Sequence, residues 1–245
     1  MQNIALPKTI KYQKGAEENQ GNMIIEPCFP GYGITLGNSL RRVLLSSLSG
    51  AAPIGVKIKG INHEFMSLPH LKEDILEFVL NLKELKLKVF SDEVVKLELN
   101  IHGKKEIKAS DITKNSLVEI VNPDFVLGHI TDMAGSLNAE IYVSRGMGYE
   151  ILESREKKDK ELGYIDMDSI FSPVISVGVE VENVRVGKMT NWDRLILNIK
   201  TDGTITPEEA FYGSANILIE QFTALVPEKK EEKKEKKEKK EKNKK

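Results

Sequence analysis

Few side chains in this sequence have the type and spacing that metal or acid–base chemistry requires. Asp166 and Asp168 form an Asp-x-Asp pair that could hold a divalent cation. Such pairs are common, however, and a place in a loop or at a strand edge is the better explanation. The four histidines form no H-x-x-x-H pair and no Cys/His cluster, so they do not indicate a metal site: they are His63, His70, His102 and His129.

The glycines of GYGITLG, at positions 31, 33 and 37, raise the question of a phosphate-binding loop. Their spacing does not fit G-x-G-x-x-G because Leu36 occupies the third glycine position, and no Gly-Lys-Ser/Thr triplet follows. No serine lies in a G-x-S-x-G elbow either. We therefore expect a tight turn before a helix, no catalytic residue, and no cofactor in this chain.

Composition favours a cytoplasmic globular protein. The 245 residues are 40% apolar, which is enough for one large core or two modest ones. Cys28 is the single cysteine and suits a small buried side chain in a reducing cytosol. The N-terminus lacks the apolar stretch of a signal peptide, and no run of about 18 apolar residues predicts a membrane span.

The nearly neutral net charge hides a basic tail. Residues 228–245 hold eleven lysines, six glutamates and no apolar residue, a balance of +5. Residues 1–227 hold 25 basic and 31 acidic residues, a balance of −6, so the body is not an obvious nucleic-acid binder. The tail is either disordered or a solvated helix laced with Glu–Lys pairs, and it either has no function or contacts DNA phosphates weakly.

Apolar spacing predicts three helices that would position any interaction surface. The segment TLGNSLRRVLLSSLSG carries an apolar stripe that includes Leu36 and Leu40, with Gly50 as a plausible stop. A second helix is expected around EDILEFVLNLKEL. The third has Thr206 as its N-cap, Glu209 in a capping box, and a heptad-like stripe typical of a helix that packs along another helix: Phe211, Ala215, Leu218, Phe222 and Leu225.

Between the helices the pattern alternates with a period of two. Apolar residues alternate with polar ones over 96–101, 137–144, 177–181 and 195–199, which predicts strands solvated on one face. The order of elements does not alternate regularly between strand and helix, so it predicts an α+β fold.

Seven blocks of the sequence, taken in order, match the pattern of one known protein family. The first, IIEPCFPGYGITLGNSLRRVLLSSL, is similar to the family pattern E-P through G-[FY]-G-x-T-L-G-N-[AS]-L-R-R-[IV]-L-L-S-S. The others are GINHEF, KEDILEFVLNLK, VEIVNPD, GYIDMDSIFSPV, VEVENVRVG and NIKTDGTITPEEA. In these blocks the chain resembles the α subunits of bacterial DNA-directed RNA polymerase, and the resemblance covers nearly all of the expected folded part.

The resemblance implies a non-catalytic scaffold of two parts. Residues 1–50 and 175–227 would form a dimerisation subdomain, residues 51–174 an inserted β-rich subdomain, and 228–245 the Lys/Glu tail. One copy of the homodimer would bind the β subunit and the other β′, in a nucleotidyltransferase complex that carries out DNA-templated transcription. The family's C-terminal DNA-binding domain is expected to be absent, which leaves DNA to the tail.

Individual roles follow from the same resemblance. The residue that contacts β falls on Arg42 with Leu45 as its neighbour, and both lie off the apolar stripe. Residues tied to β′ fall on Lys83 and Met167. We expect a dimer interface that includes Leu36, Leu40, Phe211, Leu218, Phe222 and Leu225.

Three positions depart from the family pattern. Pro30 stands where arginine is frequent, Met147 replaces the arginine of a G-R-G-Y block, and Ser176 stands where a basic residue is common. At each position the chain would lose a charged contact that the resemblance implies. Two alternatives to the scaffold remain open at this point: a metal-dependent enzyme using Asp166 and Asp168, and an independent DNA-binding protein acting through its tail.

Overall fold

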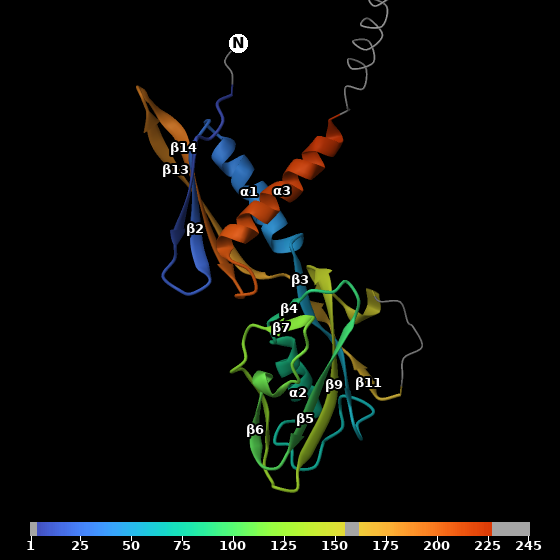
Figure 1. Ribbon diagram of the computed structural model, residues 1–245. Coiled ribbons are helices and arrows are strands. Elements are labelled where there is room, and N and C mark those ends of the chain that lie inside the picture. Colours follow the sequence, from blue (N-terminus) through green and yellow to red (C-terminus); the bar gives the residue numbers. More distant parts are fainter. Residues whose placement is uncertain (1–3, 155–161, 227–245) are drawn as a thin grey trace, which may run out of the picture.

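The computed structural model describes residues 4–154 and 162–226, so the tail predicted over 228–245 lies outside the described residues. Within the described ranges the chain is α+β, as predicted, with three α-helices and antiparallel strand pairs. Two four-stranded sheets dominate, one at each end of an elongated molecule (Figure 1).

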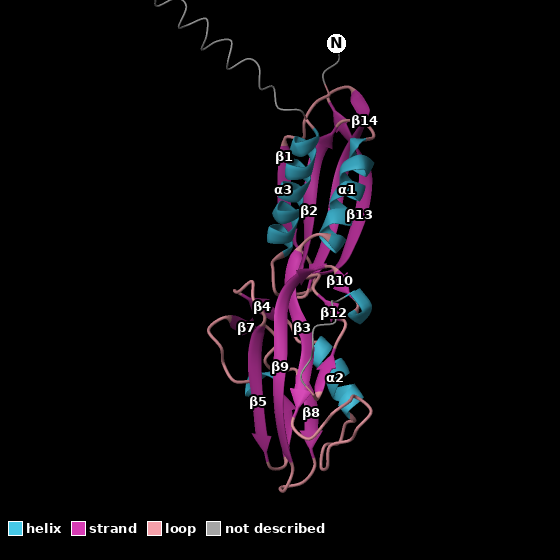
Figure 2. Cartoon of the chain, turned by 90° about the vertical axis from the view of Figure 1, so that its right-hand side faces the viewer, coloured by secondary structure: helices cyan, strands magenta, loops and turns pink. Residues whose placement is uncertain are grey.

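The first sheet has the order β1–β2–β14–β13. Its strands are β1 (Thr9–Lys14), β2 (Gln20–Cys28), β14 (Met189–Thr201) and β13 (Val174–Val186). Helices α1 (Tyr32–Ser46) and α3 (Pro207–Leu225) lie over the same face of this sheet (Figure 2). The alternating apolar residues of β14 point toward them and are fully buried in a shared core: Leu195, Leu197 and Ile199.

The second sheet has the order β11–β3–β9–β5. Its strands are β11 (Tyr164–Asp166), β3 (Ser49–Ile58), β9 (Ser136–Met147) and β5 (Val95–His102). Strict alternation along β5 puts one face in a second core and leaves the other in solvent. Helix α2 (Ile75–Lys83), which the sequence predicts, packs into the same core through Ile75, Val79 and Leu82.

Shorter elements complete the second part. They are the strand pairs β4 (Leu87–Val89) with β7 (Val118–Ile120), β6 (Lys105–Lys108) with β8 (Val126–Ile130), and β10 (Tyr149–Glu150) with β12 (Ser169–Ile170), and the 3₁₀ turns η1 (Ala109–Asp111) and η2 (Leu152–Ser154).

Two glycines of α1 bring the helix close to its sheet. A Cβ on Gly37 would lie 2.6 Å from Cγ1 of Val179, and one on Gly33 would lie 2.9 Å from Cβ of Asp193. Both distances are too short for a real contact, so these positions require glycine. The glycine-rich segment therefore serves helix–sheet packing.

The first helix is displaced from its predicted position. It begins at Tyr32 and ends at Ser46, whereas the apolar stripe predicted continuation to Gly50. Gly50 is not a helix stop: it lies in β3, where a Cβ would collide with the carbonyl of Phe171. Close approach of two backbones explains this glycine.

Candidate protein-interaction surfaces

Asp166 and Asp168 do not form a metal site with other residues. No three His, Cys, Asp or Glu side chains in the described part of the chain gather in a group that could hold a metal ion. The carboxylate of Asp168 has protein partners: Oδ1 accepts from the Leu152 amide at 2.9 Å, and Oδ2 lies 3.8 Å from Nζ of Lys83. Asp166 is in β11, opposite Gly55.

An internal carboxylate occupies the start of α1, where a phosphate loop would hold its ligand. Oδ2 of the buried Asp193 accepts hydrogen bonds from the amides of Gly31 and Gly33, at 2.9 and 3.0 Å. A negative charge there satisfies two free N–H groups and complements the helix dipole. Sequence reasoning missed Asp193, although α1 has no side-chain cap of its own and so needs an acceptor from elsewhere.

Cys28 is buried, as its sequence context predicted. Burial raises the pKa of the Cys28 thiol, and the nearby charge of Asp193 raises it further. A thiol held in its neutral form is a poor nucleophile. Cys28 therefore belongs to the core below α1.

His129 forms a hydrogen-bonded pair with Glu73 in the second part of the molecule. Nδ1 of His129 lies 2.6 Å from Oε1 of Glu73, and the His129 amide donates to Oε2 at 2.7 Å. Burial raises the pKa of Glu73, but these hydrogen bonds outweigh it and hold the pKa below its ordinary value. The pair fixes the segment before α2 against β8.

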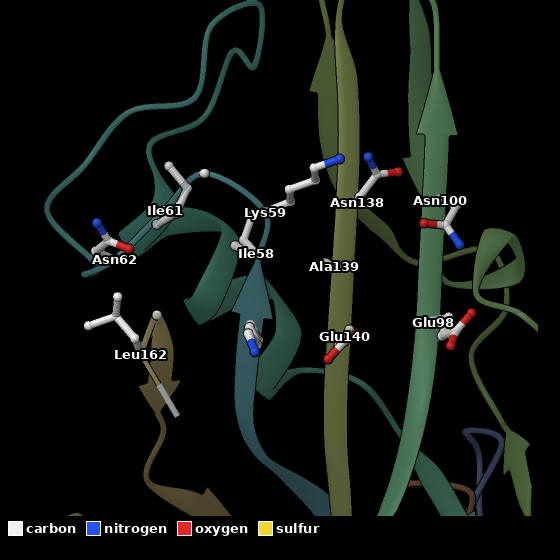
Figure 3. Close-up of a pocket in the computed structure, with 13 residues that line it drawn as sticks. Ile58, Lys59, Ile61, Asn62, Glu98, Asn100, Asn138, Ala139, Glu140 and Leu162 are labelled. Atoms are coloured by element: carbon white, nitrogen blue, oxygen red, sulfur yellow. The ribbon is translucent and has the colours of Figure 1, made fainter. Parts of the chain in front are cut away.

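A shallow hollow of about 460 Å³ lies on the outer face of the second sheet (Figure 3). Solvent-facing side chains from β3, β9 and β5 line it, including Lys57, Glu98 and Asn138. Another lining residue, Glu140, forms an ion pair with Lys96 at 2.6 Å. Charges of both signs give the hollow no preference for one class of ligand.

Helix α3 is buried against the sheet in its first half and exposed to solvent in its second half. Its first half packs on the sheet, and Phe211 is only 4% exposed. From Ile219 onward every residue up to Val226 is exposed, including Phe222 at 59% and Leu225. In Figure 1 this half of α3 extends away from the sheet.

The burial of the first half of α3 corrects part of the predicted dimer interface. Phe211 and Leu40 belong to the subunit's own core, so they offer almost no surface to a second copy. The seven-residue spacing could not separate buried from exposed positions, because a single apolar stripe packs in the core at the start of α3 and faces solvent at its end. Leu36 and Leu218 are half-buried, and Phe222 and Leu225 are the members of the set with free apolar surface.

Arg42 and Leu45 are exposed near the end of α1. Leu40 and Leu44, on the opposite side of the helix, are buried against the first sheet. The structure thus leaves Arg42 and Leu45 accessible on the surface.

The two residues tied to β′ by resemblance differ from each other. Lys83 ends α2 and is partly exposed, with its charge beside Asp168. Met167 is 1% exposed and belongs to the core of the second part. Its prediction as a surface contact is wrong, because the alternation that exposes Asp168 turns Met167 inward.

Comparison with known proteins identifies the family. Residues 56–172 match the model described as the RNA polymerase Rpb3/RpoA insert domain. The DNA-directed RNA polymerase subunit alpha of Carboxydothermus hydrogenoformans is 46% identical over 209 residues, which cover 85% of this chain and 66% of that protein. Those of Syntrophomonas wolfei and Symbiobacterium thermophilum are 48% and 46% identical, over 87% and 88% of this chain and 68% and 70% of theirs.

The chain spans about two thirds of the length of these relatives. In the described ranges no helix is long and apolar enough to cross a membrane. The identity exceeds 40% in each comparison, over at least 85% of this chain. The chain therefore belongs to the family of DNA-directed RNA polymerase α subunits.

Proposed function

We propose that this chain is a non-catalytic scaffold of RNA polymerase, which forms a homodimer and then gathers the β and β′ subunits. The observation that carries the dimer is the exposed half of α3. Ile219, Phe222 and Leu225 recur at spacings of three, so they lie along one side of the helix. A continuous apolar side in solvent indicates a protein partner.

A second copy of the chain fits this surface for a physical reason. A two-fold pairing sets the same apolar side of α3 against itself, so both copies bury their exposed residues in one contact. Tyr32 and Ile34 at the start of α1 are also exposed and add apolar surface on the other helix of the same part.

Binding of the large subunits would use a different surface. Arg42 and Leu45 combine a guanidinium with an exposed leucine, a composition typical of interface centres. We propose that they contact β in one copy and that Lys83, held beside Asp168, contacts β′ in the other. Met167 has no part in this proposal because it is buried.

Reconstitution of the enzyme tests the function. Purified β and β′ are mixed with or without this chain, and RNA synthesis on a DNA template is measured. We expect synthesis to depend on the chain and to be lost with a variant that cannot dimerise. Equal synthesis without the chain would refute the scaffold role.

A further inference from the structure

In the described ranges the chain passes twice between the first part, which holds the first sheet with α1 and α3, and the second part, which holds the second sheet. Leu48 belongs to the first core, and Ala51, three residues later, packs against the second. On the return, Met167 belongs to the second core and Val174 to the first. Two parts with separate cores and short connections move relative to each other unless a contact between them prevents it.

The two connections run side by side. A Cβ on Gly50, in the first connection, would collide with the carbonyl of Phe171 in the second and would lie 3.4 Å from Cδ of Pro173. Figure 1 shows β3 entering the second part directly from the end of α1. Another contact between the parts is looser, since a Cβ on Gly203 would lie 3.4 Å from Cγ1 of Val121. The two connections therefore form one junction, and Phe171 lies in it.

Phe171 is only 3% exposed, although it belongs to neither of the two cores that the described residues form. Its ring lies on Gly146 of β9, which pairs with Gly50 of β3 at the end of the second sheet. A Cβ on Gly146 would lie 2.7 Å from Cδ2 of the ring, which is too short for a real contact. The glycine thus leaves a seat for the ring that any larger residue would fill.

The neighbours of Phe171 attach the same point of the chain to the first part. The Ser172 hydroxyl donates to the Leu45 carbonyl at 3.3 Å, at the end of α1. Gly148, whose carbonyl accepts from the Phe171 amide at 2.8 Å, lies beside the same helix end, where a Cβ would be 3.4 Å from the Ser46 carbonyl oxygen. Because the ring is seated on the second sheet and the next residue is bound to α1, no free residue is left between the two attachments.

We propose that Phe171 is a latch that holds the two parts in one relative orientation, with Gly50 and residues 172–173 as the hinge beside it. While the ring is seated on Gly146, the end of α1 and the second sheet move together. A partner that touches both parts then meets a surface that is already ordered, which lowers the entropic cost of binding. The latch acts in the free chain as well as in a complex, so it stands apart from the proposed function.

Double electron–electron resonance tests the latch, with spin labels at Glu77→Cys on α2 and Glu180→Cys on β13. Both positions are exposed and lie in different parts, whereas Cys28 is buried and stays unlabelled. The labelled chain is mixed with an excess of unlabelled chain, so that only distances within one copy are recorded. We expect one narrow distance when Phe171 is present and a broad distribution for Phe171→Ala, because loss of the ring frees the hinge.

Two further variants make the result specific to the junction. Gly146→Val fills the seat of the ring and should broaden the distance as Phe171→Ala does. Phe125→Ala removes a ring that packs against the second core and should keep the narrow distance, although it also lowers the stability of the second part. Circular dichroism checks that each variant is folded, and Phe171→Leu takes the place of the alanine variant if that one does not fold.

The outcomes are distinct from those that test the proposed function. An unchanged narrow distance in the folded Phe171 variant or in Gly146→Val would overturn the latch, and so would a broad distribution in the labelled chain without either change. Equal broadening in Phe125→Ala would also overturn it, because a general loss of stability would then explain the motion. Each outcome is read from the free chain, so it holds whether or not the chain gathers β and β′.

Discussion

Replacing Phe222 with aspartate should break the dimer without unfolding the subunit. Phe222 lies in the exposed half of α3 and is absent from the core cluster of the first part. Its ring therefore contributes little to the stability of one copy. In the proposed dimer it is covered by the second copy, and a carboxylate there would lose its water.

The free energy that Phe222 contributes to the dimer can be estimated from the exposed area of its side chain. An aromatic side chain offers about 150–250 Å², so the 59% exposed fraction of Phe222 leaves about 90–150 Å² for a partner. At roughly 25 cal/mol per Å² this burial is worth about 2–4 kcal/mol per copy as an upper bound. Even the lower figure raises the dissociation constant of the dimer by about thirtyfold.

The assay is light scattering over a concentration series, together with urea unfolding. We expect Phe222→Asp to be monomeric where the unmodified chain is dimeric. Gln221→Asp, an exposed neighbour, is the control and should stay dimeric. Phe211→Ala should instead lower the free energy of unfolding by about 3–5 kcal/mol, since Phe211 is in the core. An unchanged dimer mass for Phe222→Asp would show that the interface lies elsewhere.

Four further outcomes are expected. Arg42→Ala should keep the dimer and weaken capture of β on the order of thirtyfold, because a central interface arginine is worth about 2 kcal/mol; wild-type capture in a pull-down would contradict this. Asp193→Ala leaves two amides of α1 without an acceptor and should lower the free energy of unfolding by about 1–3 kcal/mol, measured by urea midpoint; no change would refute the capping role. The lowered pKa of Glu73 means that its contribution to the free energy of unfolding is present at neutral pH and is lost as the pH falls through that lowered pKa. Glu73→Gln should therefore lose less stability in acid than the unmodified chain; parallel curves of unfolding free energy against pH would exclude this contribution. Removing residues 228–245 should leave assembly normal and lower DNA affinity mainly at low salt, with at most about five contacts of slope −0.9 each; identical salt slopes would mean that the tail makes no such contacts.

Sequence patterns predicted much of the fold because they reflect interactions between residues that are near one another in sequence. Helix α3 begins at Pro207 with Thr206 as its cap: the Glu209 amide donates to the Thr206 hydroxyl, and the Glu209 carboxylate accepts from the Thr206 amide, as the capping box predicts. The period-two segments correspond to β5, β9, β13 and β14. The capping box and the alternation of faces depend only on neighbours in sequence.

The remaining features depend on contacts between distant residues. Asp193 caps α1 from 160 positions away, which no spacing rule in α1 reveals. Phe211 and Phe222 share one stripe, and only the length of the sheet beneath α3 decides which of them is buried. Met167 is buried for the same kind of reason, since it follows β11 along the edge of β3 and its amide donates to the Ile54 carbonyl.

Native mass spectrometry of the assembled complex tests the scaffold role most directly. The purified chain is mixed first with β and then with β′, and the mass of each species is recorded. We predict a homodimer, then a complex of two copies with one β, then a complex of two copies with one β and one β′. A single copy in the final complex, or β and β′ joined at full yield without this chain, would contradict the scaffold.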